Sequence, residues 1–239
     1  MDNERGRNME RRNIENREKR NDLLEAIKAR HSVRQYKDLP ITEDSKAELE
    51  QEIAECNRES GLHIQIIYDD PECFDTFLSH YGKFSNVKNY IAIVGKKSDQ
   101  LEELGGYYGQ RIVLKAQMLG LNTCWVGGTY GKGKCKADSA AGEKIVCVIA
   151  IGYGENEGTK HKSKPVEKLC EVPEDKMPVW FKNGLVGTMM APTALNQQKF
   201  HVTLEGDEAF ITAKAGAFSK VDLGIVKYNF EAASGHRCG

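Results

Sequence analysis

Two short segments of the sequence carry the residues best suited to chemistry, and the first is a basic cluster. Arg30, His31, Ser32 and Arg34 lie together within RHSVR. A guanidinium presents a planar fork of donors that matches a phosphate, and a serine hydroxyl adds one more donor. Each charge-assisted hydrogen bond is worth about 1.5–3 kcal/mol, so the cluster could hold a phosphorylated ligand. A solvated basic turn after a helix is the alternative interpretation.

The second segment is APTALNQQ, at residues 191–198, where a turn containing proline follows an apolar stretch. Pro192 restricts the backbone, and Thr193, Asn196 and Gln198 carry side chains that both donate and accept hydrogen bonds. Such side chains suit the edge of a ring that mixes donors and acceptors. Taken alone, the segment is equally typical of a polar turn between a helix and a strand.

Two glycine-rich segments resemble nucleotide-binding loops, but both depart from those motifs. Residues 128–135 match most of a P-loop, yet Cys135 stands where that motif has Ser or Thr. Residues 152–158 have dinucleotide-like glycine spacing, but the TKHKSKP that follows is a poor helix, and a dinucleotide site needs a helix there. Both segments are therefore predicted to be loops.

The composition of the chain limits the classes of function. Among 239 residues, 34 Lys and Arg nearly balance 35 Asp and Glu, so no overall field attracts nucleic acid or a membrane. No apolar run approaches the roughly 20 residues that span a bilayer. Residues 1–20 mix charges of both signs without an apolar stretch, which predicts a flexible extension rather than a secretory signal. Seven cysteines without a C-x-x-C pair favour reduced thiols in a cytoplasmic protein, with no disulfide framework or metal site.

The elements that must position the two segments can be predicted from hydrophobic spacing. Helices are predicted to begin near Asn21 or Asp22, after Thr42 and after Gly105-Gly106, and to cover residues 180–190 and 221–230. Strands are predicted near residues 62–66, 90–94, 124–126, 145–151 and 200–204. Gly120 is placed to end the third helix in the left-handed conformation. Strands interspersed with helices imply a layered α/β or α+β domain.

The sequence also contains a weak internal echo. Residues 62–70 (LHIQIIYDD) align with residues 200–208 (FHVTLEGDE), and an amphipathic helix precedes each of them. A glycine-containing helix follows each segment at a greater distance. The echo suggests a degenerate duplication with halves at about 21–170 and 171–239, although simple strand alternation would produce part of the match.

Together these segments resemble the FMN-dependent nitroreductase family over residues 21–239. RHSVRQY resembles its phosphate- and ribityl-binding segment, GYYGQRIVLKAQMLGLNTCWVGG its central helix and following strand, and APTALNQQKF its second flavin-contacting turn. The resemblance implies a nitroreductase-like α+β fold with helices flanking a central mixed, mostly antiparallel sheet. It also implies an FMN cofactor whose contacts would come from Arg30, His31, Ser32, Arg34, Gly127, Gly128, Lys162, Lys164, Pro192, Thr193, Ala194, Asn196 and Gln198.

The order of the motifs departs from that of the usual family members. There the second turn follows the first motif by a few tens of residues, whereas here it begins at Pro192, and Lys199-Phe200 replaces the expected Pro-Trp. This arrangement resembles the permuted nitroreductase-like subgroup. The usual members are homodimers with FMN between subunits, so a duplicated chain with one motif in each half implies a monomeric pseudo-dimer; a homodimer is the alternative.

The activity implied by the resemblance is that of an FMN-dependent oxidoreductase. NADH or NADPH would reduce the flavin, and a small electron-poor acceptor such as a nitroaromatic or a quinone would reoxidise it. One alternative is a non-catalytic flavin-binding sensor or carrier. Another is a different flavin reaction such as reductive dehalogenation, whose substrate lid would lie around residues 71–89.

Overall fold

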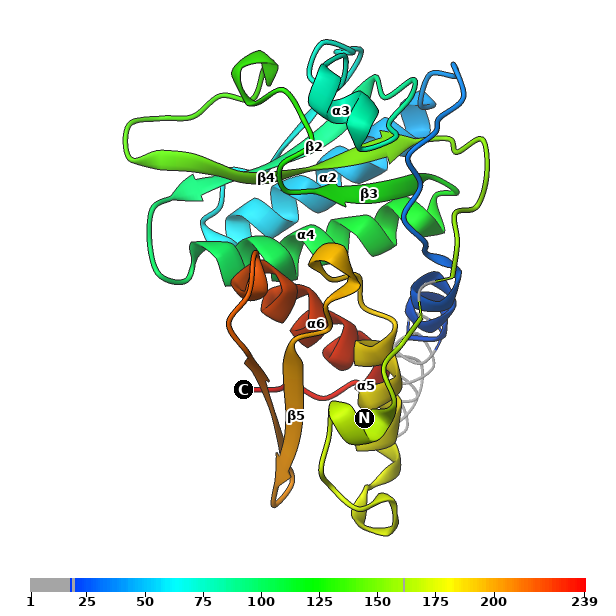
Figure 1. The fold of residues 1–239 in the computed structure, drawn as a ribbon, viewed down its shortest axis with the longest axis vertical. Helices are drawn as coiled ribbons and strands as arrows, with labels where there is room; N and C mark the ends of the chain where they lie inside the picture. Colours follow the sequence, from blue (N-terminus) through cyan, green and yellow to red (C-terminus); the bar gives the residue numbers. More distant parts are fainter. Residues whose placement is uncertain (1–17, 19, 161) are drawn as a thin grey trace, which may run out of the picture.

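The computed structural model of the protein describes residues 18, 20–160 and 162–239 (Figure 1). The predicted extension at residues 1–20 falls outside this part of the chain, except for residues 18 and 20, which are helical. Helical structure continues to residue 29, so Asn21 and Asp22 lie inside the helix and do not cap its start as predicted. Ala26 and Ile27 are the buried residues of this N-terminal helix.

A four-stranded sheet forms the upper part of the molecule in Figure 1. Its strands are β1 (Gln65–Ile67), β2 (Asn89–Lys96), β3 (Asn122–Val126) and β4 (Glu143–Gly152), in the order β1-β2-β4-β3. All three pairings are antiparallel, and Ser32 adds an isolated parallel bridge to Thr123 at the outer edge of β3. The sheet is therefore mostly antiparallel, as expected.

The two faces of the sheet bury different sets of side chains because successive residues of a strand point to opposite sides. Ile91 and Ile93 pack with Leu49 and Ile112 from two helices, α2 (Glu43–Ser60) and α4 (Leu101–Met118). The opposite face of β2 presents its alternate residues to the loops between β1 and β2 and to the segment after the N-terminal helix. That second face is where short, irregular segments cover the sheet.

A second layer packs beneath α4 and completes the molecule (Figure 1). It consists of α5 (Val179–Met189), α6 (Ser219–Ser234) and a hairpin of β5 (Phe200–Glu205) with β6 (Glu208–Ala213). Its core combines Phe181, Phe200, Ile225 and Phe230, all of which are buried. The short elements are α3 (Phe77–Tyr81) and four 3-10 turns, η1 (Lys132–Lys134), η2 (Val166–Lys168), η3 (Glu174–Lys176) and η4 (Ala194–Asn196).

Glycines let α4 and α6 approach closely enough to join the two layers. A Cβ on Gly106 would lie 2.0 Å from the carbonyl oxygen of Val221, and one on Gly224 would lie 1.9 Å from that of Glu103. The two contacts are reciprocal, because each glycine meets the residue three positions before the other glycine. Gly105 and Gly106 were predicted to precede α4, but both lie inside it. Gly106 lies at the contact with α6, whereas a Cβ on Gly105 would meet the Ile93 side chain of β2 at 2.7 Å.

The other predicted elements agree with the structure to different degrees. Thr42 caps α2 as expected, its hydroxyl accepting from the Ser45 amide, and Gly120 has a φ of 75° just beyond α4. The strand predicted at residues 62–66 is wrong in position, since β1 covers only Gln65–Ile67, and β6 was missed. Over the described part of the chain, no helix has the length and apolar character needed to cross a bilayer.

Candidate functional site

The basic cluster follows the N-terminal helix and runs along the edge of β3. Ser32 bridges Thr123, and the Val33 amide donates to the Thr123 carbonyl at 3.1 Å. Farther on, Tyr36 is buried, and its hydroxyl donates to the Val33 carbonyl at 2.7 Å. These bonds hold the segment against the sheet, so its side chains have a fixed position relative to the end of β3.

The turn after α5 has an unusual backbone. Leu195, Asn196 and Gln198 adopt φ values of 52°, 51° and 43°, in the left-handed region that is costly for residues with a Cβ. Asp222, a buried residue in the first turn of α6, supports this conformation. Its Oδ1 accepts from the Ala194 amide at 2.8 Å. Clustered strain of this kind persists where the surrounding structure enforces it, and such sites are often functional.

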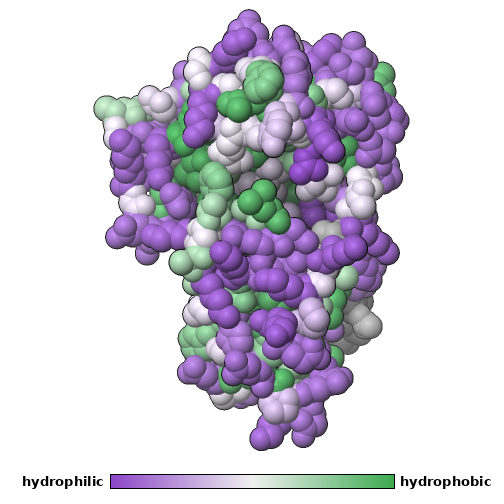
Figure 2. All heavy atoms as spheres, in the orientation of Figure 1, coloured by the Kyte–Doolittle hydropathy of each residue, from purple (hydrophilic) through white to green (hydrophobic). Residues whose placement is uncertain are grey.

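These two segments, about 160 residues apart in sequence, meet at one cavity of about 810 Å³. In the space-filling view a hollow with apolar and weakly polar walls lies between the upper and lower parts of the molecule (Figure 2). Ten of the predicted residues line the cavity: Arg30, His31, Ser32, Arg34, Gly127, Gly128, Pro192, Thr193, Ala194 and Asn196. The volume lies within the roughly 300–1,000 Å³ typical of ligand and cofactor pockets.

Arg30 is the most informative residue of the cavity wall. Its side chain is only 4% exposed, and among the described residues no carboxylate forms an ion pair with it. Burial lowers the pKa of Arg30 to about 10, because the charged form loses hydration, and the nearby Cys124 offsets this effect only in part. Burying a charge without a partner is unfavourable, so the site is suited to an anion that enters the cavity.

Arg34 and Ser32 of the same cluster are arranged differently from Arg30. The Arg34 side chain is exposed, and its guanidinium lies over the Phe84 ring, 5.9 Å from the centroid. Ser32 is half-buried and interacts with the Cys124 thiol. Arg30 therefore lies in the depth of the wall and Arg34 near its solvent side.

The glycine pair after β3, Gly127 and Gly128, lines the cavity. Nothing lies within 4 Å of a Cβ built on Gly128, whereas a Cβ on Gly127 would meet the Phe218 ring at 2.4 Å. Phe218 itself has a φ of 58° and lines the cavity. Gly127 thus allows an aromatic ring to rest on the backbone, and Gly128 leaves open space.

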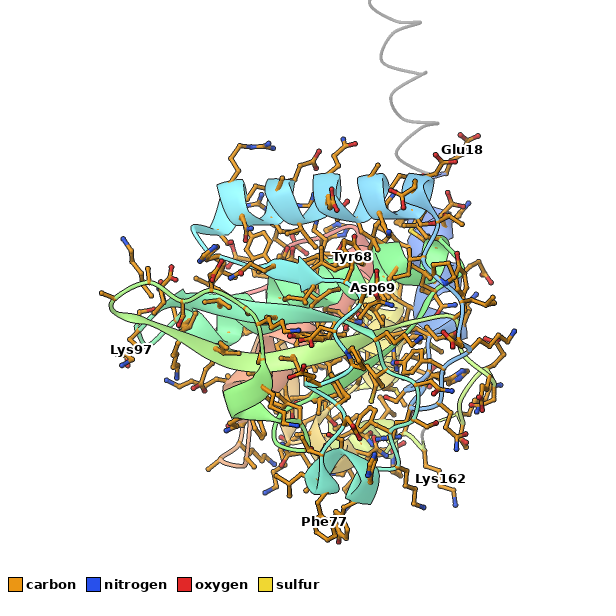
Figure 3. The ribbon with its side chains drawn as sticks, turned by 90° about the horizontal axis from the view of Figure 1, so that it is seen from above. Glu18, Tyr68, Asp69, Phe77, Lys97 and Lys162 are labelled. Carbon is orange, nitrogen blue, oxygen red and sulfur yellow. The ribbon has the colours of Figure 1, made fainter. Side chains whose placement is uncertain are left out.

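Three predicted site residues do not line the cavity. Gln198 is buried behind the turn, where it donates to the Lys162 carbonyl and accepts from the Lys164 amide. The Lys164 ammonium donates to the Gln197 carbonyl at 2.7 Å. The Lys162 side chain points away from the protein (Figure 3). The structure gives Gln198 and Lys164 a role in holding the turn, and contact of any of the three with a cofactor stays a prediction.

Several cavity residues were not found from the sequence. Asp222 and Phe218 come from the start of α6, Trp125 from β3, and Gly82 to Phe84 from the loop after α3. Asp222 had a recognisable signal, since an acidic residue in the first turn of a helix is favoured near exposed amides. For Phe218 the sequence has no such signal, because its left-handed backbone is imposed by packing.

The two glycine-rich segments that resemble nucleotide-binding motifs, and that were predicted to be loops, have the expected irregular structure. Residues 128–135 contain only the 3-10 turn η1, and the element that comes next is the strand β4; after residues 152–158 the next element among the described residues is the 3-10 turn η2. The described residues also hold no group of three or more His, Cys, Asp or Glu side chains suited to a metal ion.

Comparison with known proteins identifies the family. The profile described as "Putative TM nitroreductase" matches residues 22–234. A structure titled as a putative nitroreductase from Thermotoga maritima has 23% identity, covers 88% of this chain and 82% of its own, and superposes with a TM-score of 0.65. A search of curated proteins finds no match.

Two further solved structures have lower similarity. A putative nitroreductase in complex with FMN from Desulfovibrio desulfuricans has 21% identity, covers 63% of this chain and 96% of its own, and has a TM-score of 0.51. A nitroreductase family protein from Streptococcus pneumoniae has 14% identity, covers 63% and 99%, and has the same TM-score. These structures confirm the nitroreductase-like fold. The chain therefore belongs to the nitroreductase family described by this profile and is a nitroreductase-like oxidoreductase.

Proposed function

We propose that the chain is an FMN-dependent oxidoreductase that takes electrons from NADH or NADPH and reduces a small electron-poor acceptor. The observation that carries the proposal is the buried Arg30 guanidinium in the wall of a cofactor-sized cavity, with no carboxylate paired to it in the described part of the chain. A ligand phosphate is the counter-charge that this arrangement lacks. The Desulfovibrio structure titled as a complex with FMN supports the choice of cofactor.

The residues of the cavity fit the parts of FMN. Arg30, Ser32 and Arg34 would hold the phosphate through charge-assisted hydrogen bonds. Asn196 and the amides of the strained turn offer donors and acceptors that suit the polar edge of the ring. The open space beside Gly128 leaves room for a flat ring against the backbone. When bound, FMN supplies the two-electron chemistry, accepting hydride and passing electrons to the acceptor.

The chain's own contribution is binding, orientation and exclusion of water. Trp125, Val126 and Phe84 make the inner wall apolar, which strengthens electrostatic interactions within the cavity. Asp222 holds the turn by accepting from the Ala194 amide and from the Gln197 side chain at 2.7 Å. Both walls come from the same chain, which supports one cofactor per chain in a monomeric pseudo-dimer, with a homodimer as the alternative.

The experiment that tests the function begins with the absorption spectrum of freshly purified protein. A yellow sample that releases FMN, identified by chromatography, supports the cofactor assignment, and protein that neither retains nor takes up FMN contradicts it. NADH and NADPH oxidation is then followed with a quinone or nitroaromatic acceptor. Steady turnover supports the oxidoreductase, whereas stoichiometric FMN without turnover supports the sensor or carrier instead.

Stoichiometry tests the arrangement of the site. The proposal expects one FMN per chain and a monomer, measured by light scattering, that binds it. A flavin-containing dimer that loses its cofactor whenever it dissociates would contradict the pseudo-dimer and favour the homodimer.

A further inference from the structure

Two loops on the irregular face of the sheet are joined by a polar network outside the cavity. The carboxylate of Asp70 forms an ion pair with the Lys136 ammonium at 2.9 Å and accepts from the Tyr90 hydroxyl at 2.7 Å. The Lys136 amide donates to the same hydroxyl at 2.9 Å. The same two loops are also joined through their backbones, since the Gly131 amide donates to the Cys73 carbonyl at 2.8 Å. The network brings residues 70–73 and 131–136 to one place.

The network brings two cysteines together in the core on this face of the sheet. Cys73 is fully buried there, and Cys135, which is partly exposed, packs against the same cluster of side chains. Interactions with Cys73 and with the Ala137 amide lower the pKa of the Cys135 thiol, against the opposing effect of burial. Thiolate is the nucleophilic form of cysteine, so Cys135 is the reactive member and Cys73 the protected one.

The other five cysteines lack this combination. Burial raises the pKa of Cys56, Cys124, Cys147, Cys170 and Cys238. Cys238 is the useful comparison, since it is partly exposed like Cys135 but has a pKa of about 12 and no thiol neighbour among the described residues. Exposure alone therefore does not make a thiol of this chain reactive.

We propose that Cys73 and Cys135 form a redox-active dithiol that low-molecular-weight disulfides oxidise to an intramolecular disulfide. The Cys135 thiolate attacks one sulfur of the reagent, forming a mixed disulfide and releasing one thiolate. Cys73 then attacks the Cys135 sulfur, and the second reagent thiolate leaves. The protons of the two protein thiols pass to the two leaving thiolates, so one reagent disulfide is reduced to two thiols as the protein loses two electrons.

The bond would connect two segments that border the cavity. Cys73 precedes α3 and the cavity residues at 82–84, and Cys135 follows the cavity residues at 127–129. The exposed Phe77 of α3 points away from the protein on the side of the sheet opposite α2 (Figure 3). A disulfide would restrain this loop against the segment after β3. The inference concerns thiol chemistry and does not depend on the proposed flavin reaction.

The experiment incubates the full-length protein with oxidised glutathione, blocks remaining thiols with iodoacetamide and maps the peptides by mass spectrometry. The expected product is a peptide pair joined through Cys73 and Cys135, with loss of two titratable thiols per chain and full recovery by dithiothreitol. The Cys238→Ser variant should form the same product at the same rate. In Cys73→Ser, the mixed disulfide on Cys135 should persist, and in Cys135→Ser, Cys73 should stay unmodified.

The outcomes separate a dithiol from independent surface thiols. A stable glutathione adduct on Cys135 of the unaltered protein, without the joined peptides, would overturn the proposal. So would oxidation that begins at Cys238. Because mapping of the unaltered protein decides the matter, the proposal stays testable even if Cys73→Ser, at a fully buried position, folds poorly.

Discussion

Two arginines of this molecule meet very different surroundings. Arg111, on α4, contacts Glu55 at 3.1 Å and Glu59 at 2.9 Å and also pairs with Glu52, all on α2. Burial lowers the pKa of Arg111, but the hydrogen bonds and charges of the glutamates outweigh it and raise the pKa overall. Arg30 is more deeply buried, yet it has no such carboxylates around it in the described residues.

The difference indicates which arginine serves the fold and which serves a ligand. The fold supplies three carboxylates to Arg111, and a partnered guanidinium joins two helices without needing anything from outside. Arg30, by contrast, is buried in the wall of the cavity. An unpaired buried charge lowers stability unless a partner arrives, so its presence favours binding of an anion.

The largest effect is expected from a substitution that disturbs the helix packing on which the positions of both arginines depend. In Gly224→Ala, the added Cβ would collide with the Glu103 carbonyl oxygen and push α6 away from α4, which carries Arg111. Overpacking of this kind costs roughly 3 kcal/mol or more at such a tight contact, so chemical denaturation should show a large loss of stability together with loss of FMN. Gly128→Ala is the control: it should stay folded, because its Cβ meets nothing, and weaken only FMN binding.

Arg30→Met should separate binding from stability. The loss of a buried charge-assisted contact of about 3 kcal/mol weakens FMN roughly 100-fold in a fluorescence titration. The unfolding free energy of the FMN-free variant should not fall, because an apolar side chain of similar size replaces an unpaired charge. Unchanged FMN affinity would refute the phosphate assignment, and a large loss of apo stability would show that Arg30 has a structural partner.

Arg111→Met is the reciprocal experiment. It leaves three glutamates on α2 without their cation, and the unfolding free energy should fall by about 1 kcal/mol through like-charge repulsion. FMN affinity should be unchanged. If this variant lost FMN as Arg30→Met does, the division between a structural and a ligand-binding arginine would be wrong.

Arg34→Ala should have a smaller effect on FMN than Arg30→Met. The side chain is exposed and lies over Phe84, so solvent screens its interaction with a phosphate. We expect about tenfold weaker binding, which corresponds to about 1.4 kcal/mol, and a strong dependence on salt. Equal losses of FMN affinity in the two variants would mean that burial of an arginine in the cavity wall does not strengthen its contact with the phosphate.

The smallest effect is expected in the strained turn on the other wall. Leu195 is 97% exposed with a φ of 52°, so its side chain loses little packing when replaced. Leu195→Asn should raise the unfolding free energy by less than about 1 kcal/mol, because asparagine tolerates the left-handed region better. The change in stability is measured by thermal denaturation of the variant and the unaltered protein. Lower stability of the variant would mean that the Leu195 side chain packs against the protein more than its exposure implies.

Local rules explain which parts of the fold could be predicted. The helix cap at Thr42 and the left-handed backbone at Gly120 depend on neighbouring residues, and both were correctly predicted. The buried strands β2 and β4 were correctly predicted for the same reason, because each is a continuous apolar run. β6 was missed because its alternation is weak and its partner is β5. Gly105 and Gly106 were misplaced because each is required by packing against another element, Gly106 against α6 and Gly105 against Ile93 of β2, which the neighbouring residues do not reveal.

The same limit applies to the candidate site. The residue types in RHSVR and APTALNQQ indicated phosphate and ring contacts, and ten of the thirteen predicted residues line one cavity. Lys162, Lys164 and Gln198 do not line it, because side-chain direction depends on the turn that they hold. The sequence could not show that Arg30 is buried and Arg34 exposed. Both are basic residues of one short segment, and their burial depends on which distant segments pack over each side chain.

The sequence by itself determined the kinds of chemical group available and the local elements that carry them, because propensities and periodicity act over a few residues. Only the tertiary structure decided that two segments about 160 residues apart share one cavity and that Arg30, unlike Arg111, is buried with no carboxylate paired to it among the residues that the structure describes. It also decided that Cys73 and Cys135 pack in the same cluster. Burial and long-range contacts arise from packing of the whole chain, and they set the charge, reactivity and accessibility of each group.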